Sequence, residues 1–238
     1  IALSMCAFSM LFLICYRSSA INESLIKLAT AIVAVEQNKS LKKKIKISSN
    51  VGKIGSDADI VKLGMRTGDS YYLKDLLHAM LLKSANDTAV AIAEGTSGSE
   101  ARFMKQVNKK MKKIGCRKTV FGTPSGLRSS KTHYTTAKDV AIMSRELITK
   151  YPQVLDYTKI WMEDITHVTK QGSSLFTLSS TNKLLKQYPY TTGLKTGFTS
   201  NAKYCVSATA KKENISLIAV VMAPETSDLR NQDAINLF

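Results

Sequence analysis

The chain has 238 residues, of which 44% are hydrophobic, and a formal net charge of +16 at pH 7. Its length suits one large domain or a domain of two lobes, and its apolar content can fill a hydrophobic core. The positive charge favours anionic partners such as a wall polymer or a membrane surface, whereas the absence of zinc-finger spacing and of RNA-binding motifs argues against nucleic acid.

The first 20 residues form a segment of their own. Residues 1–16 are largely apolar and end at Arg17, and they resemble the apolar core of a secretory signal. Residues 18–20 are small and offer a cleavage site, which favours an extracytoplasmic protein in the cell envelope or at a membrane. Because the chain opens on Ile1, we treat residues 1–20 as a signal-like or wrongly joined segment of a fragment. The alternative is an ordinary buried helix or strand.

The next part of the chain, to about residue 151, has mainly helical patterns. Residues 25–35 carry apolar side chains on every face of a helix, which predicts a buried central helix with Ser24 at its N-cap. Residues 45–47 alternate as a short strand, and the four glycines within residues 52–68 indicate a loop. Further helices are predicted at residues 73–82, 88–94, 99–114 and 137–149.

The last third of the chain changes from helix to strand. Short strands are predicted at residues 160–168 and 174–178, and a hairpin joins residues 204–210 to 215–222. A final helix begins at residue 228. We therefore predict a mixed α+β fold, with an antiparallel sheet from the C-terminal part, helices on its faces and a helical lobe over about residues 70–151.

The cysteines and histidines carry no recognisable metal or redox pattern. The four cysteines form no C-x-x-C pair, and two of them, Cys6 and Cys15, lie in the apolar N-terminal run. The three histidines are scattered and form no H-x-x-x-H pair. We expect no disulfide framework, no metal site and no cofactor.

Ser24 and Lys27 stand three residues apart at the start of the predicted central helix. That spacing brings the two side chains to one face, so the amine can reach the hydroxyl. A serine becomes a nucleophile when a base takes its proton, and a lysine can serve if burial or a nearby cation disfavours its charge. The alternative is a capping serine with an outward lysine.

Two later segments favour the catalytic interpretation of Ser24 and Lys27 over the capping one. Three short motifs stand in a fixed order: Ser24-x-x-Lys27, Ser84-x-Asn86 and Lys195-Thr196-Gly197. Together, S-x-x-K, S-x-N and K-T-G are typical of the serine penicillin-recognising enzymes. Their predicted contexts are a helix start, a loop between helices and a strand, which strengthens the pattern considerably.

The chain resembles the D-alanyl-D-alanine carboxypeptidases of the low-molecular-weight penicillin-binding class. The resemblance runs from about residue 22 to the C-terminus and includes residues 76–87, 126–137 and 192–199. It implies a β-lactamase/transpeptidase-like peptidase domain over residues 21–238. The family's C-terminal β-rich domain and membrane-attaching helix have no counterpart in this sequence, so we expect a C-terminally truncated chain.

The resemblance also implies roles for single residues. Ser24 would attack the D-Ala-D-Ala bond of a peptidoglycan pentapeptide, with Lys27 as base and Ser84 passing the proton to the leaving D-alanine. The backbone N–H groups of Ser24 and Phe198 would form the oxyanion hole. The remaining residues implied to bind substrate are Asn86, Lys195, Thr196 and Gly197. β-Lactams would acylate the same serine as inhibitors.

Two alternatives remain open. A class A-like β-lactamase shares the three motifs, but that class carries aspartate where this chain has Ala85, and we find no convincing E-x-x-L-N stretch. A catalytically inactive wall-binding homologue is the second alternative. Asn22 and Glu23 stand where the family has Pro-Ala, and the 23 residues before Ser24 do not resemble the two strands expected there.

Overall fold

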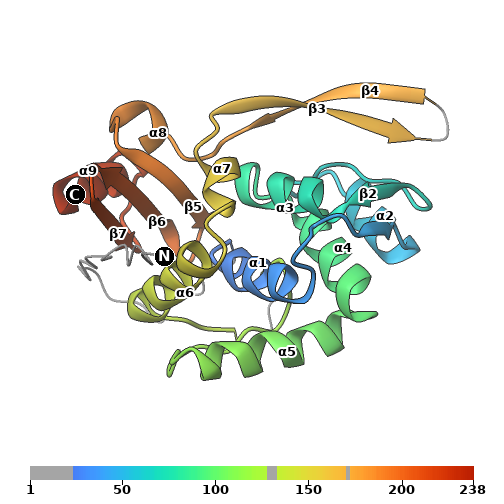
Figure 1. Ribbon diagram of the computed structural model, residues 1–238, viewed down its shortest axis with the longest axis horizontal. Coiled ribbons are helices and arrows are strands. Elements are labelled where there is room, and N and C mark those ends of the chain that lie inside the picture. The colour runs from blue at the N-terminus through green and yellow to red at the C-terminus, as the bar shows by residue number, and fades with distance from the viewer. Residues whose placement is uncertain (1–23, 128–132, 170–171) are drawn as a thin grey trace, which may run out of the picture.

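A computed structural model describes residues 24–127, 133–169 and 172–238 of the chain (Figure 1). The signal-like segment predicted at residues 1–20 lies outside these ranges. The helices are α1 Ile26–Gln37, α2 Ser49–Ser56, α3 Leu73–Leu82, α4 Asn86–Ser97, α5 Glu100–Lys113, α6 Ala137–Lys150, α7 Val154–Thr158, α8 Leu184–Gln187 and α9 Ser227–Leu237. The strands are β1 Lys44–Lys46, β2 Ser70–Tyr72, β3 Met162–Thr169, β4 Gly172–Ser179, β5 Thr191–Thr199, β6 Lys203–Lys212 and β7 Ile215–Val221.

An antiparallel sheet of order β5-β6-β7 forms the C-terminal half of the fold. Its β6 alternates between two faces, as a strand must. Cys205 belongs to the core cluster that includes α1 and α6, whereas Val206 and Ala208 pack with Leu184 and Ala234 from α8 and α9. Figure 1 shows these helices on opposite sides of the sheet. The predicted mixed α+β fold with flanking helices is therefore confirmed.

Helix α1 is the centre of the core. Every residue from Ile26 to Val35 is buried, and the helix packs against α3, α4, α5 and α6. This burial confirms the central helix that the apolar sequence predicts. The predicted cap is wrong by one residue: Leu25 occupies the N-cap position without a side-chain hydrogen bond, and Ser24 lies in the turn just before it.

The loop predicted between residues 52 and 68 is wrong for its first part, which is helix α2. Ser48 caps this helix by accepting a hydrogen bond from the Val51 N–H over 3.1 Å. Gly55 faces the returning chain so closely that an added Cβ would lie 2.3 Å from the Met65 carbonyl oxygen. Gly52 and Gly55, the two glycines of α2, therefore permit close packing of this helix, whereas Gly64 and Gly68 lie in the loop that follows it.

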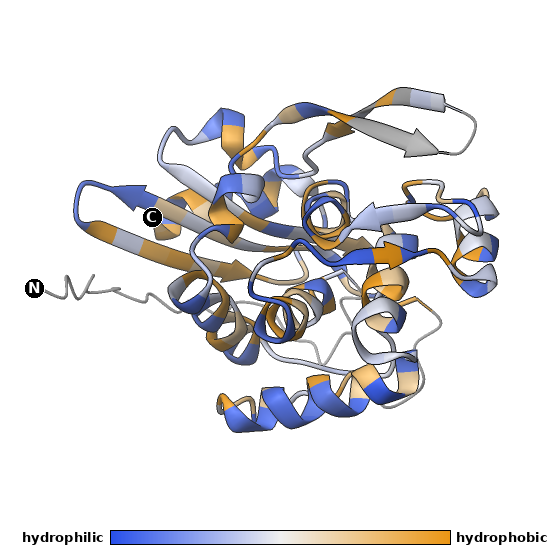
Figure 2. Cartoon of the chain, turned by 45° about the vertical axis from the view of Figure 1, so that its right-hand side comes forward, coloured by the Kyte–Doolittle hydropathy of each residue, from blue (hydrophilic) through white to orange (hydrophobic). Residues whose placement is uncertain are grey.

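Two smaller antiparallel pairs flank the α-helices. β1 pairs with β2, and β3 pairs with β4 to form an arm that extends along α3 in Figure 1. The hydropathy colours place apolar residues between the sheet and its helices, while α5 is hydrophilic along much of its length (Figure 2).

Candidate active site

A cavity of about 940 Å³ lies where α1 begins, α3 gives way to α4, and the edge strand β5 faces the base of the β3–β4 arm. Seven of the eight site residues predicted from sequence line it: Ser24, Lys27, Ser84, Asn86, Thr196, Gly197 and Phe198. The eighth, Lys195, is 1% exposed, and its Nζ donates to the Thr196 carbonyl oxygen over 2.8 Å. The structure therefore brings three distant motifs to one place.

The Lys27 ammonium is held inside the protein. Its side chain is 1% exposed, and its Nζ donates to Asn86 Oδ1 over 2.9 Å and to the Ser125 carbonyl oxygen over 2.8 Å. The Ser125 segment is itself tied to α1, because Thr30 Oγ1 donates to the Pro124 carbonyl oxygen over 2.8 Å. These contacts fix the amine at the base of the cavity rather than in solvent.

Asn86 is the first residue of α4, and its amide has a fixed orientation. Its Nδ2 donates to the Val61 carbonyl oxygen over 2.8 Å, and its backbone N–H donates to the same oxygen over 2.9 Å. With the amide nitrogen used in this way, Oδ1 is directed at Lys27. The sequence offers no sign of Val61, since any residue could supply this carbonyl.

Ser84 lies in the connection between α3 and α4 and adopts φ = 65°, in the left-handed region. A residue with a Cβ pays roughly 1–2 kcal/mol for that conformation. Such a conformation persists where the surroundings hold it, and it is common at functional sites. Here it accompanies a serine whose side chain lines the cavity.

Basic side chains gather at the β5 side of the cavity. Lys195 is fully enclosed, and burial, followed by the charges of Lys27 and Arg230, holds its pKa well below the usual range. Thr196 Oγ1 lies 2.6 Å from Thr181 Oγ1, so one of the two hydroxyls donates to the other. A basic side chain and a hydroxyl in this arrangement suit an anionic group, whose charge would in turn favour protonation of Lys195.

Arg230 also lines the cavity, and sequence reasoning missed it. It is 4% exposed and belongs to α9, where its Nε and Nη2 donate to Asn231 Oδ1 over 3.0 and 2.8 Å. Asn231 is held in turn by Gln187 over 2.7 Å. A cation in the first turn of a helix is electrostatically unfavourable, because the helix N-terminus carries partial positive charge. The position of Arg230 in its helix is therefore a sequence signal that could have pointed to a functional role.

His133 is a further buried titratable group, and it lies close enough to Lys27 for the lysine charge to affect its pKa. Burial and the Lys27 charge lower its pKa to about 4, so the ring is neutral at pH 7. Its Nδ1 accepts a hydrogen bond from the Gly122 N–H over 3.3 Å, which assigns the ring proton to Nε2. Nε2 is buried and makes no hydrogen bond with the residues that the structure describes.

Neither a metal centre nor a membrane span is found in the part of the chain that the structure describes. No three histidine, cysteine or carboxylate side chains gather there to bind a metal ion. None of the helices in that part is both long and apolar enough to cross a bilayer. The polar side chains that line the cavity carry hydroxyl, amine, amide and guanidinium groups and the carboxylate of Asp59.

The family model described as D-alanyl-D-alanine carboxypeptidase matches residues 19–226. The chain belongs to the D-alanyl-D-alanine carboxypeptidase family. Among curated members of that family, D-alanyl-D-alanine carboxypeptidase DacF of Bacillus subtilis is 36% identical over 212 residues, covering 87% of this chain and 52% of the relative. The chain therefore spans about half the length of that carboxypeptidase.

Solved structures of penicillin-binding proteins and DD-transpeptidases share the fold. Penicillin-binding protein D2 from Listeria monocytogenes, solved in its cefotaxime-bound form, has a TM-score of 0.75 and 32% identity, with 92% of this chain and 85% of that one covered. The Streptomyces K15 DD-transpeptidase has a TM-score of 0.82 and 25% identity, with 93% and 89% covered. The family resemblance and the transpeptidase-like fold predicted from sequence are both confirmed.

Proposed function

We propose that this chain is a serine-type D-Ala-D-Ala carboxypeptidase, which removes the terminal D-alanine from peptidoglycan stem pentapeptides through an acyl-enzyme on Ser24. The observation that carries the proposal is the enclosed amine of Lys27, fixed by Asn86 and Ser125 in the cavity that Ser24 also lines. A serine nucleophile requires a base that takes its proton, and an enclosed lysine amine can serve as that base.

In the first step, the Ser24 hydroxyl oxygen forms a bond to the carbonyl carbon of the penultimate D-alanine, and its proton passes to Lys27 in the amine form. Repulsion between the enclosed amines of Lys27 and Lys195 disfavours the state in which both are protonated. The amide C–N bond then breaks, and the leaving nitrogen receives a proton through the Ser84 hydroxyl. Water hydrolyses the resulting ester and restores Ser24.

The negative charge that develops on the carbonyl oxygen would be stabilised by the backbone N–H groups of Ser24 and Phe198. Loss of one such donor typically costs about 3 kcal/mol in the barrier. Gly197, beside Phe198 on the edge strand β5, lets a substrate backbone lie close to the strand because it carries no side chain.

The terminal carboxylate of the substrate would lie at the positive side of the cavity. Thr196 offers a hydroxyl, Arg230 a guanidinium and Lys195 a positive potential from beneath the strand when it is protonated. Arginine suits this task because its planar group can donate two parallel hydrogen bonds to a carboxylate. The same groups would receive the carboxylate of a β-lactam inhibitor.

Three assays on the purified protein test the function together. We expect fluorescent penicillin to label Ser24, with the adduct mapped to its peptide by mass spectrometry, and D-alanine to be released from a pentapeptide. Nitrocefin should acylate the protein stoichiometrically, because the sequence has no convincing E-x-x-L-N stretch to supply the deacylating glutamate of class A β-lactamases. Rapid nitrocefin turnover would favour the β-lactamase, and no Ser24-dependent label would favour the inactive wall-binding homologue.

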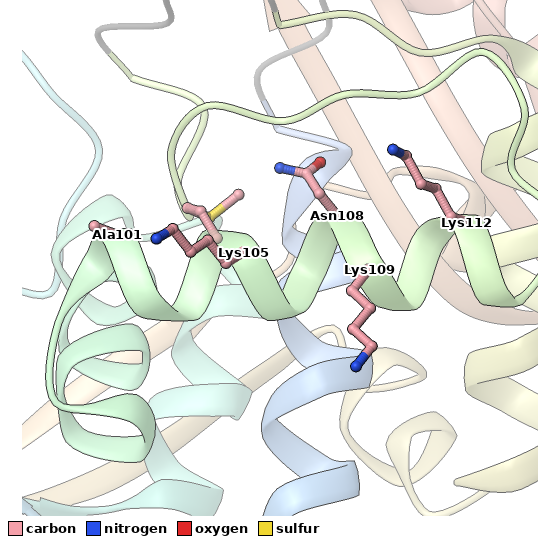
Figure 3. A pocket seen from close by; sticks show the side chains of 6 residues that line it. Ala101, Lys105, Asn108, Lys109 and Lys112 are labelled. Atoms are coloured by element: carbon pink, nitrogen blue, oxygen red, sulfur yellow. The ribbon is translucent and has the colours of Figure 1, made fainter.

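We further propose that residues 21–238 form one peptidase domain, with a helical lobe over about residues 70–151, that acts in the cell envelope outside the cytoplasm. An anionic wall polymer or membrane surface would contact the lysines of α5. Lys105, Lys109 and Lys112 are exposed around a hollow of about 480 Å³ on this helix (Figure 3).

Binding to that surface can be measured with anionic vesicles and with purified cell walls. Lys105→Gln combined with Lys112→Gln should weaken co-sedimentation with both, and more so at low salt, where exposed charges are screened least. The matched control is Lys211→Gln with Lys212→Gln, which removes two exposed charges from the end of β6. Equal losses in the two double variants would contradict a specific role for α5.

A further inference from the structure

Asp87 is a fully buried carboxylate in the first turn of α4. Its Oδ1 accepts hydrogen bonds from the backbone N–H groups of Leu63 and Thr88, each over 2.9 Å. Its Oδ2 accepts from Gly64 over 2.9 Å, from Leu63 over 3.1 Å and from Met65 over 3.3 Å. One carboxylate thus gathers three consecutive N–H groups of the segment that follows α2.

The segment that Asp87 binds, residues 63–65, is continuous with the wall of the cavity. Val61, two residues before Leu63, lines the cavity together with Asp59 and Ile60. The Val61 carbonyl oxygen accepts both hydrogen bonds from Asn86, over 2.8 and 2.9 Å. Neighbouring residues of α4 therefore hold the same loop at two points, Asn86 through Val61 and Asp87 through the three N–H groups.

The position of the Val61 carbonyl decides which end of the Asn86 amide meets Lys27. While the carbonyl accepts from Nδ2, the amide oxygen faces the Lys27 Nζ at 2.9 Å. If the loop moves away, the Asn86 NH2 group loses this acceptor, and the amide is no longer held with its oxygen toward Lys27. Control of the loop is therefore control of an acceptor for the proposed base.

We propose that Asp87 is a positioning residue for acyl transfer: by gripping the loop at Leu63–Met65 it fixes the Val61 carbonyl, and through it the orientation of Asn86 toward Lys27. This inference rests on the proposed function of Ser24 and Lys27. Asp87 need not touch substrate for this role, because it acts through two intervening residues.

The hydrogen bonds between Asp87 and the loop require a carboxylate and not an amide. Both oxygens accept N–H groups, and bonds to an ionised acceptor are stronger than neutral ones. Asparagine has the same shape but replaces one acceptor with an NH2 group that would face backbone donors. Asp87→Asn therefore changes the loop contact while leaving the volume of the side chain almost unaltered.

The experiment compares Asp87→Asn with Glu146→Gln as a matched control. Glu146 is a largely buried carboxylate, 13% exposed, that pairs with Lys110 over 3.0 Å and with Lys150 over 2.7 Å, and it lines no part of the cavity. Penicillin acylation is followed from pH 5 to pH 10 at a temperature at which circular dichroism shows all proteins folded. If Asp87→Asn fails to fold, Asp87→Ser, which keeps one acceptor, replaces it.

We expect Asp87→Asn to slow acylation at least tenfold and to move the midpoint of its pH profile, whereas Glu146→Gln keeps the wild-type midpoint. In amide exchange measured by NMR, the Asn86 side-chain NH2 protons should exchange at least tenfold faster in Asp87→Asn. An unchanged midpoint together with unchanged Asn86 exchange would overturn the proposal. If the wild type is not acylated at Ser24, the proposed function fails, and the exchange of Asn86 alone then decides the positioning role.

Discussion

The Lys27 ammonium donates a hydrogen bond to Asn86 Oδ1 over 2.9 Å, although 59 positions separate the two residues in the chain. The contact joins the start of the central helix α1 to the start of α4. It places the proposed base of the first motif against the last residue of the second motif. A pair that is unrelated in sequence therefore forms the inner wall of the cavity, and the proposed chemistry depends on it.

Ser24→Ala should abolish labelling by fluorescent penicillin, and Lys27→Ala should nearly abolish it. The first variant lacks the attacking oxygen, and the second lacks the group that takes its proton. Labelling on a denaturing gel measures both, with circular dichroism as a check of folding. Ser227→Ala removes another hydroxyl that lines the cavity and should label like the wild type. Persistent labelling of Ser24→Ala would contradict the assignment of the nucleophile.

Arg230→Gln should raise KM for a peptide with a free C-terminal carboxylate and lower kcat/KM by about 10- to 100-fold, because a hydrogen bond to a charged group contributes roughly 1.5–3 kcal/mol. A peptide with an amidated C-terminus should be affected much less. Steady-state D-alanine or D-alaninamide release compares the two. Arg145→Gln, which alters an exposed arginine of α6, is the control. Equal losses on both peptides would argue against a carboxylate contact.

His133 should make stability depend on pH. Its pKa is about 4 in the folded protein and 6.5 in the reference state, so the unfolded chain binds the additional proton between these values. Stability is therefore full above pH 6.5, falls as the pH drops toward 4 and changes no further through this group below it. The loss amounts to about 3 kcal/mol. Urea unfolding should show a shallower dependence in His133→Asn, and an unchanged slope would contradict this account.

Gly55→Ala should lower the free energy of unfolding by about 1–3 kcal/mol, since overpacking of this size is typically destabilising. The added Cβ would lie 2.3 Å from the Met65 carbonyl oxygen, a backbone atom that cannot turn away. Because Met65 also donates to Asp87, penicillin acylation should slow as well. Ser56→Ala, one residue along the same helix and exposed, should change neither quantity. Wild-type behaviour of Gly55→Ala would contradict the close packing of this loop.

Periodicity made the larger elements predictable. The helix expected at residues 73–82 is α3, and the expected hairpin is β6–β7, within one or two residues at each end. Such patterns are local, because a helix or strand with one buried face has apolar residues at regular spacing along a short stretch of sequence. The same reasoning failed at α2, where Gly55 packs closely against the backbone of Met65 in the returning chain. The sequence of a helix does not show which other segment will pack against it.

The candidate site likewise contains groups that could be predicted from sequence and groups that could not. Side chains that belong to short motifs, such as Ser24 and Lys195, could be named from sequence and are found in or beneath one cavity. The carbonyl oxygens of Val61 and Ser125 could not be named, because every residue carries such a group. Arg230 belongs to none of the three motifs; its place in a helix start hints at it in sequence, but only the folded chain brings it to the cavity.

The cavity is lined by Ser24, just before α1, and by Arg230 in α9, two parts of the chain that are far apart in sequence. Contacts between parts so distant along the polypeptide form slowly, because the entropy of closing a long loop must be overcome first. During synthesis, Ser24 therefore emerges well before Arg230, and the two residues can line one cavity only after α9 has been made. Until α9 docks, the cavity lacks the guanidinium proposed to bind the substrate carboxylate, so this part of the proposed binding site forms only after the segment that carries Arg230 has been synthesised.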